Sequence, residues 1–224
     1  MKNKTYLVHS IFVSVSGECG NIPQGAWTVF VRFQGCNLRC SYCDTKKAQK
    51  MAGSGCRMSE QDILKAIDRL QAPGLLKLPV LLTGGEPLAQ EIAPLIKRLL
   101  TLNYSVSVET NGSFRVPFHS HNLTWIVDYK LPGSGQEENM SLSNFGFLSS
   151  SDYIKFVCTD KEDFARACFL VDFLQRTNPN THPSFLFSAC SPLRHSVLFD
   201  WMRGDRLWKV RLNVQIHKLC TLKE

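Results

Sequence analysis

The sequence predicts an α/β fold, an open or partial β/α barrel of about six strand-helix units, formed by one domain that covers residues 1–224. Short apolar segments with strand-like patterns alternate with amphipathic helical segments, and this order implies parallel strands joined by right-handed crossovers. Six units are fewer than the eight of a closed barrel. A chain of 224 residues with 44% hydrophobic and 20% charged residues suffices for one full core and is short for two.

The first elements are recognised by their residue patterns. Residues 28–33 alternate as a strand does and end at a Gln-Gly pair, so the cysteines that follow lie at the carboxyl end of a strand. Residues 59–71 form an amphipathic helical pattern, with Ser59 as candidate N-cap and Asp62 in the first turn.

The remaining elements continue the alternation. Two Gly- and Ser-rich stretches, 52–55 and 133–135, are expected to be loops. The apolar and amphipathic patterns predict strands at 79–82, 105–109, 124–127, 153–157, 184–187 and 210–215 and helices at 89–102, 161–175 and 197–202.

Composition and charge argue against several classes of protein. No stretch approaches the roughly 18 apolar residues of a membrane span, and the N-terminal apolar run lacks a small-residue cleavage site, so we expect a cytoplasmic protein with no membrane contact. The net charge of +7 comes from scattered residues, apart from Lys46, Lys47 and Lys50, which favours a solvated surface over a nucleic-acid partner. The 9 cysteines are expected to be reduced thiols, some of them metal or cluster ligands.

Three of these cysteines, Cys36, Cys40 and Cys43, lie within eight residues of each other. One loop can therefore wrap a single inorganic core. Iron-sulfur clusters ordinarily take four thiolates, so three would leave one iron open. The alternative is a structural zinc site, which needs a fourth ligand, and Cys56 is the nearest candidate.

The C-x-x-x-C-x-x-C spacing, with Tyr42 just before the last cysteine, resembles the signature of the radical S-adenosylmethionine (SAM) superfamily. This resemblance implies a partial β/α barrel that holds a [4Fe-4S] cluster, whose open iron is chelated by SAM. Reductive cleavage of SAM then yields a 5′-deoxyadenosyl radical that abstracts hydrogen from the substrate. Residues 83–87, TGGEP, resemble the superfamily's GGEP motif, although an ordinary strand-to-helix turn has the same composition.

Within the superfamily the chain resembles the 7-carboxy-7-deazaguanine synthase family over nearly its whole length. Residues 15–18, Val-Ser-Gly-Glu, stand where the family has its substrate-binding S-x-Q-G-E-G run. Ser16 stands in place of the common Gln, and Cys19 in place of the second Gly. Family blocks also match, in order, at Cys43-Asp44-Thr45 and at residues 109–112, 128–132 and 215–218.

The family resemblance implies a reaction and its requirements. The reaction is conversion of 6-carboxy-5,6,7,8-tetrahydropterin to 7-carboxy-7-deazaguanine with loss of ammonia, a step of queuosine and deazapurine biosynthesis. It requires Mg²⁺ and regenerates SAM. The resemblance also implies an electron donor such as flavodoxin and a homodimer, which is the commonest oligomer by default.

Site residues follow from the same resemblance, position by position, and no residue is assigned as catalytic. The substrate is expected to contact Val15, Ser16, Gly17, Arg32, Thr83, Gln215, His217 and Lys218. The cofactor pocket is expected to include Tyr42, Cys43, Asp44, Gly85, Glu109, Asn111, Asp128, Tyr129 and Lys130, and Thr45 is the expected Mg²⁺ ligand.

Chemistry supports some of these roles, and simpler roles stand beside them. A guanidinium such as Arg32 can grip a carboxylate in a bidentate fork, but it could also form a surface ion pair. His217 could be a structural strand-end histidine, Glu109 could end a strand, and Lys130 could be solvated. Thr45 could cap the turn after the cysteines.

Two other functions compete with this interpretation. An activating enzyme of a glycyl-radical protein shares the cysteine signature and acts on a partner protein, but it does not need Ser16-Gly17-Glu18 or the 215–218 block. A non-enzymatic iron-sulfur or zinc protein would leave the GGEP motif, residues 109–112 and Arg32 unexplained together.

Overall fold

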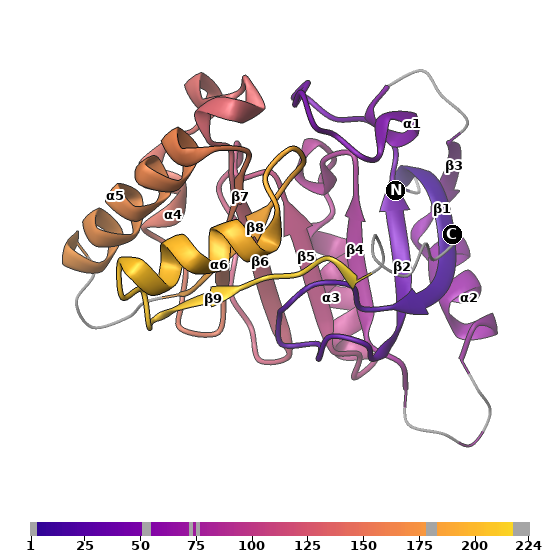
Figure 1. The fold of residues 1–224 in the computed structure, drawn as a ribbon. Helices are drawn as coiled ribbons and strands as arrows, with labels where there is room; N and C mark the ends of the chain where they lie inside the picture. Colours follow the sequence, from indigo (N-terminus) through magenta and orange to yellow (C-terminus); the bar gives the residue numbers. More distant parts are fainter. Residues whose placement is uncertain (1–3, 51–54, 72–73, 75–76, 178–182, 217–224) are drawn as a thin grey trace.

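The computed structural model describes residues 4–50, 55–71, 74, 77–177 and 183–216. Within these residues nine strands form a single sheet in the order β3-β1-β2-β4-β5-β6-β7-β8-β9 (Figure 1). The strands are β1 (Thr5–Val15), β2 (Trp27–Phe33), β3 (Cys56–Ser59), β4 (Val80–Gly84), β5 (Val106–Thr110), β6 (Leu123–Tyr129), β7 (Tyr153–Cys158), β8 (Ser184–Ala189) and β9 (Val210–Leu212). The helices are α1 (Lys46–Gln49), α2 (Glu60–Arg69), α3 (Ala93–Thr101), α4 (Leu142–Phe145), α5 (Lys161–Thr177) and α6 (His195–Gly204), with 3-10 turns η1 (Pro87–Ala89), η2 (Pro132–Ser134) and η3 (Glu137–Asn139).

The predicted parallel sheet is confirmed, and it is not closed. From β2 to β9 every neighbouring pair of strands is parallel, and among the described residues β3 and β9 are the two edges. Strands β1 and β3, which no sequence pattern predicted, extend this sheet by antiparallel pairing. The architecture is therefore a partial barrel with an antiparallel extension at its N-terminal side.

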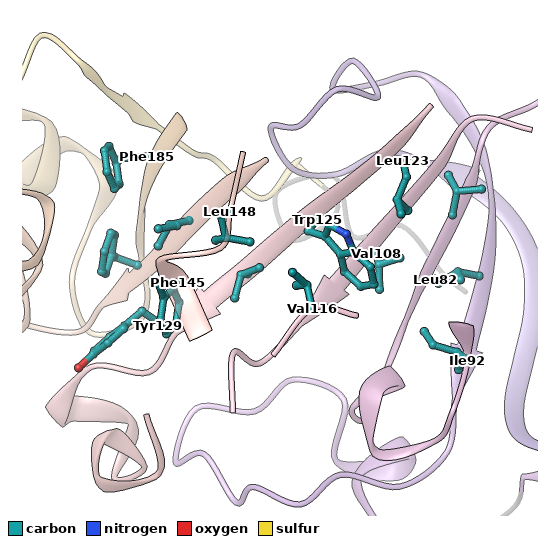
Figure 2. Packing of buried hydrophobic residues seen from close by; sticks show 14 of the residues in the cluster. Leu82, Ile92, Val108, Val116, Leu123, Trp125, Tyr129, Phe145, Leu148 and Phe185 are labelled. Carbon is teal, nitrogen blue, oxygen red and sulfur yellow. The ribbon is translucent and has the colours of Figure 1, made fainter. Parts of the chain in front are cut away.

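Strand alternation gives the sheet two chemically different faces. In β7, Ile154 and Phe156 are fully buried in the hydrophobic core, whereas Lys155 between them points to the opposite face. The core face packs against α2, α3, α5 and α6, and Figure 2 shows Trp125 of β6 within it. The other face, here called the inner face, carries polar residues at the matching positions of several strands and is the wall of the site.

Helix α2 begins where the sequence predicts. The Ser59 hydroxyl accepts a hydrogen bond from the Asp62 backbone, and the Asp62 carboxylate accepts one from the Ser59 backbone at 3.2 Å, which completes the capping box. The helix buries Ile63 and Ile67 completely, and each contributes about 2 kcal/mol of hydrophobic stabilisation. Ser59→Ala would remove the cap, at a cost of about 1 kcal/mol.

Helix α3 is shorter than the predicted helix at 89–102. Residues 87–89 form the turn η1 instead, and α3 starts at Ala93 with Pro94 in its first turn. Proline lacks an N–H donor and fits the first turn of a helix but not its interior, so Pro94 sets the starting point. Two connections, β5 to β6 and β6 to β7, contain no helix longer than four residues, so regular strand-helix alternation does not extend through the middle of the sheet.

Candidate active site

The candidate site is a cavity of about 160 Å³ at the carboxyl ends of the parallel strands. Loops after parallel strands meet at this edge, which is where α/β barrels place their sites. The cavity is lined by Glu18, Cys36, Leu38, Cys40, Tyr42, Cys43, Asp44, Thr45, Gln49, Thr83, Gly84, Gly85, Glu109, Thr110, Asn111, Ile126, Asp128, Lys130, Lys155, Val157, Cys190 and Gln215.

The cysteine loop, residues 36–45, connects β2 to α1 and is closed at its base by backbone hydrogen bonds. Gly35 N–H donates to Ala48 C=O at 2.7 Å, and Cys36 N–H donates to Gln49 C=O at 3.0 Å. Gly85 packs directly under this base, since a Cβ there would lie 2.0 Å from the Gly35 carbonyl oxygen. Glycine is thus required at position 85 of the GGEP turn primarily because the packed chain leaves no room for a side chain.

The far side of the cysteine loop is attached to the loop after β6. Ser41 donates its hydroxyl to Gly133 C=O at 2.8 Å and its N–H to Ser134 C=O at 3.0 Å. Gly133 in turn donates its N–H to the buried Asp163 carboxylate of α5 at 2.8 Å. The cysteines are therefore held between two parts of the sheet that are distant in sequence.

All three loop thiols face the same cavity. Burial raises the pKa of Cys36 and of Cys40, and the Cys36 sulfur accepts contacts from Leu38 N–H at 3.4 Å and from Asn111 Nδ2 at 3.6 Å. Among the described residues no three His, Cys, Asp or Glu side chains converge to hold a single metal ion. Cys56, the fourth ligand of the zinc alternative, is exposed on β3 and does not line the cavity.

Glu86 connects the two turns that flank the cavity. This carboxylate is fully buried and accepts hydrogen bonds from Leu88 N–H at 2.8 Å, from the Thr110 hydroxyl at 2.7 Å and from Asn111 N–H at 2.6 Å. Burial raises its pKa, whereas these donors oppose the rise. Because Asn111 also reaches Cys36, Glu86 sets the position of a residue that touches a predicted cluster ligand.

Acidic and basic side chains share the inner face. Burial, with the Glu18 charge next in size, raises the pKa of Glu109 to about 7, against the opposing charge of Lys155 and a hydrogen bond from the Thr83 hydroxyl at 2.8 Å. Lys130 donates to Asp128 at 2.9 Å, and although burial lowers the pKa of Lys130, the Asp128 charge raises it overall. Near neutral pH, Lys130 is charged and Glu109 can hold a proton.

Most predicted site residues come together in this cavity. Those that line it are Tyr42, Cys43, Asp44, Thr45, Thr83, Gly85, Glu109, Asn111, Asp128, Lys130 and Gln215, with Cys36 and Cys40. Those outside the lining are Val15, Ser16, Gly17, Arg32 and Tyr129. His217 and Lys218 lie outside the described residues.

The Tyr129 side chain lies outside the cavity lining. Strand β6 continues to Tyr129, so alternation sends the side chains of Asp128 and Tyr129 to opposite faces. Tyr129 is 3% exposed in the hydrophobic core, with its ring centroid 5.2 Å from that of Phe145 (Figure 2).

Arg32 lies just behind the lining rather than in it. The side chain projects from the inner face of β2, is buried, and donates to the Thr45 hydroxyl at 3.4 Å. Thr45 in turn donates to the Asp44 carboxylate at 2.9 Å. The predicted substrate anchor and the predicted Mg²⁺ ligand are thus neighbours.

The loop after β1 engages neighbouring segments through its backbone. Ser16 exchanges backbone hydrogen bonds with Ala26 and Gly25, and the Gly17 carbonyl accepts one from Ile216 N–H at 3.0 Å. The Cys19 N–H donates to Asn213 Oδ1 at 2.7 Å. The segments that follow β1 and β9 therefore meet across the open side of the barrel.

Three residues of the site, Glu18, Glu86 and Lys155, had no predicted role there. Glu18 and Glu86 belong to recognised motifs, which predicted that they lie near the site but not what their side chains contact. Lys155 had a signal of its own, because it is a single charge within the apolar segment YIKFVC, and alternation would have placed it on the inner face.

Comparison with known proteins identifies this arrangement. Residues 30–116 match the model of the radical SAM superfamily. The 7-carboxy-7-deazaguanine synthase of Clostridium acetobutylicum is 37% identical over 220 residues, which cover 96% of this chain and 95% of that protein. This chain belongs to the 7-carboxy-7-deazaguanine synthase family. It is therefore a radical SAM enzyme, and an activating enzyme of a glycyl-radical protein is not favoured.

Two further relatives of the family support the same assignment. The 7-carboxy-7-deazaguanine synthases of Koribacter versatilis and Methanospirillum hungatei are 32% and 38% identical, over 97% and 96% of this chain and 97% and 85% of theirs. The crystal structure of QueE from Escherichia coli has the same fold, with a TM-score of 0.72 at 23% identity over 94% of each chain. No helix within the described residues has the length and apolar character needed to cross a membrane.

Proposed function

We propose that this chain converts 6-carboxy-5,6,7,8-tetrahydropterin to 7-carboxy-7-deazaguanine with loss of ammonia, as a step of queuosine and deazapurine biosynthesis. One observation carries the proposal beyond the superfamily: the thiols of Cys36, Cys40 and Cys43 share a cavity with a wall of alternating acidic and basic groups. A polar bicyclic substrate with a carboxylate needs such a wall for its orientation.

The residues present fit a [4Fe-4S] cluster and SAM. Cys36, Cys40 and Cys43 would hold the cluster, and the Asp128 Oδ1 atom is buried and accepts no hydrogen bond from the described part of the chain, so it can receive a donor of a bound cofactor. When bound, the cluster and SAM supply the 5′-deoxyadenosyl radical that begins the reaction. Asp128 and Lys130 would orient the cofactor, and Glu109 can hold a proton near neutral pH while the substrate loses ammonia.

For Mg²⁺ we propose Thr45 as the hydroxyl ligand. Thr45 lines the cavity and its hydroxyl donates to the Asp44 carboxylate at 2.9 Å, and Mg²⁺ prefers oxygen ligands while keeping several waters. Arg32 behind it would grip the substrate carboxylate through its guanidinium fork. Both roles require that the bound substrate and ion take over part of the contacts that Arg32 and Thr45 now make with each other.

Four further proposals concern the protein as a whole. Residues 1–224 would form a single radical SAM domain, which the one continuous sheet supports. A flavodoxin-like protein would supply electrons to the cluster, and two chains would form a homodimer. The protein would act in the cytoplasm, where its cysteines stay reduced.

Anaerobic reconstitution tests the proposed reaction. The chain is loaded with iron and sulfide and incubated with 6-carboxytetrahydropterin, SAM, Mg²⁺ and a reductant, and 7-carboxy-7-deazaguanine is detected by mass spectrometry. Cys40→Ala serves as the matched control without an intact cluster site. A fully loaded chain that cleaves SAM and makes no deazaguanine would contradict the proposal.

A further inference from the structure

Lys155 is a buried cation that no motif or resemblance assigned to the site. It projects from β7 onto the inner face, and its side chain is 9% exposed. A lysine is almost never buried to this extent unless its charge is paired. Its contacts therefore indicate what it holds in place.

The Lys155 ammonium connects two carboxylates from different parts of the chain. Its Nζ lies 2.8 Å from Glu18 Oε2 and 3.4 Å from Asp128 Oδ2. Glu18 belongs to the loop after β1, where substrate contacts are expected, and Asp128 belongs to β6, beside Lys130 on the expected cofactor wall. Lys155 thus joins the two halves of the cavity.

Glu18 gathers further donors from the C-terminal side of the barrel. Asn213 donates to Glu18 Oε2 at 3.2 Å, and Gln215 donates to Glu18 Oε1. The Asn213 side chain also donates to the Ser188 hydroxyl at 2.8 Å. Through Glu18, the ammonium of Lys155 therefore holds together segments that lie at opposite ends of the sheet.

The positive charge of Lys155 compensates the negative charges of the carboxylates around it. Burial by itself lowers the pKa of Lys155, but Glu18, Asp128 and Glu109 outweigh it and raise that pKa well above the ordinary value. Without this ammonium, Glu18 and Asp128 would lose their shared cation, and Glu18 would face Glu109 with less compensation. The Glu18 carboxylate would then take up a proton, or the loop that carries it would move.

We infer that Lys155 is a positioning residue, which fixes Glu18 and the substrate loop against Asp128 so that substrate and cofactor are held in register. The inference rests on the proposed function. A buried ion pair often adds little net stability, whereas it can specify one arrangement among several. A small misplacement of a reacting centre lowers the rate about 100-fold. A link that fixes the relative position of substrate and cofactor can therefore control the rate.

The test compares holoenzyme variants after anaerobic reconstitution. Lys155→Met removes the charge at similar size, Lys155→Arg keeps it, and Glu18→Gln weakens the link from the other side. Lys209→Met, at an exposed lysine outside the cavity lining, is the matched control. The measurements are KM and kcat for 6-carboxytetrahydropterin, 5′-deoxyadenosine released per product, and iron content.

For Lys155→Met we expect about a tenfold or larger rise in KM and more 5′-deoxyadenosine per product, while iron content stays at the wild-type level. Lys155→Arg should recover most of the loss. The double variant Lys155→Met with Glu18→Gln should be no worse than the worse single variant, because both remove one link. Glu18→Gln alone carries the test if Lys155→Met does not fold.

Three results would overturn the inference beside an active wild type. One is an unchanged KM and 5′-deoxyadenosine ratio in Lys155→Met. Another is a loss of activity that only follows the loss of folded, iron-loaded protein. The third is a double variant in which the effects of Lys155→Met and Glu18→Gln add. A fully loaded wild type that makes no product would instead overturn the proposed function, and this inference with it.

Discussion

Replacement of Glu86 by Gln tests whether the two turns that flank the cavity depend on one buried carboxylate. The Oε1 atom of Glu86 accepts from both Leu88 N–H and the Thr110 hydroxyl, so the amide oxygen of Gln can take over those two bonds. Its NH₂ group would then face Asn111 N–H, where Oε2 now accepts at 2.6 Å. One charge-assisted bond is lost and two buried donors oppose each other. We expect the free energy of unfolding to fall by about 3 kcal/mol, since relief from burying a charge offsets part of the cost.

The assay is an equilibrium urea titration of the cluster-free protein under reducing conditions, followed by tryptophan fluorescence. Trp125 is fully buried and should report global unfolding. Glu138→Gln, at an exposed glutamate, is the control and should change the free energy by about 0.5 kcal/mol or less. If Glu86→Gln matches that control, the hydrogen bonds of Glu86 do not determine how the turns are held.

Four further predictions follow from the site. Alanine at Cys36, Cys40 or Cys43 should abolish the visible absorbance of the reconstituted cluster, whereas alanine at Cys56, which is exposed and outside the cavity lining, should leave it intact. Arg32→Lys keeps the charge without the fork, so KM for the pterin should rise about tenfold while uncoupled SAM cleavage persists; an unchanged KM would place the carboxylate anchor elsewhere. Thr45→Val should retain the cluster and SAM binding but lower turnover and shift the Mg²⁺ response to higher concentration, and a normal response would exclude Thr45 as the ligand. Because burial raises the pKa of Glu109 to about 7, the stability of the wild type relative to Glu109→Gln should be greatest below about pH 4.5 and fall by about 1–3 kcal/mol as pH rises through 7; urea titrations that give a constant difference would contradict this.

Local signals were sufficient for the parallel part of the fold. The capping box of α2 and the alternation in β2 are encoded within a few residues, so each was visible in the sequence. Strands β1 and β3 were missed because their pairing is antiparallel and long-range, with Thr5 opposite Ser59, and no strand-helix alternation marks them. Helix α3 was placed too early because the apolar pattern was given more weight than Pro94, which limits where a helix can begin.

The difference between local sequence signals and long-range contacts also explains which site residues could be predicted. Motif residues in loops, such as Asp44 and Asn111, were identified by resemblance and do line the cavity. Tyr129 was grouped with Asp128 and Lys130 because they form one motif block, yet the period of two in β6 separates it from them. The contact of Lys155 with Glu18 joins residues 137 positions apart, so no local pattern encodes it.

Ser16 and Cys19, the two departures from the family pattern, differ in how much their hydrogen bonds depend on the side chain. Cys19 meets the C-terminal segment through its backbone N–H, which any residue other than proline supplies, and its φ is not positive. Ser16 is likewise anchored by its own N–H and C=O, to Ala26 and Gly25. At position 19 the side chain can therefore change without breaking the bond from Cys19 N–H to Asn213, whereas a residue without a hydroxyl at position 16 would lose the bond that Ser16 Oγ donates to Glu18 C=O at 3.3 Å. Glu18 is different, because its link to Lys155 is made entirely by its carboxylate. Within this loop, Glu18 thus makes its long-range link through its side chain, whereas Ser16 and Cys19 are attached to other segments mainly through their backbones.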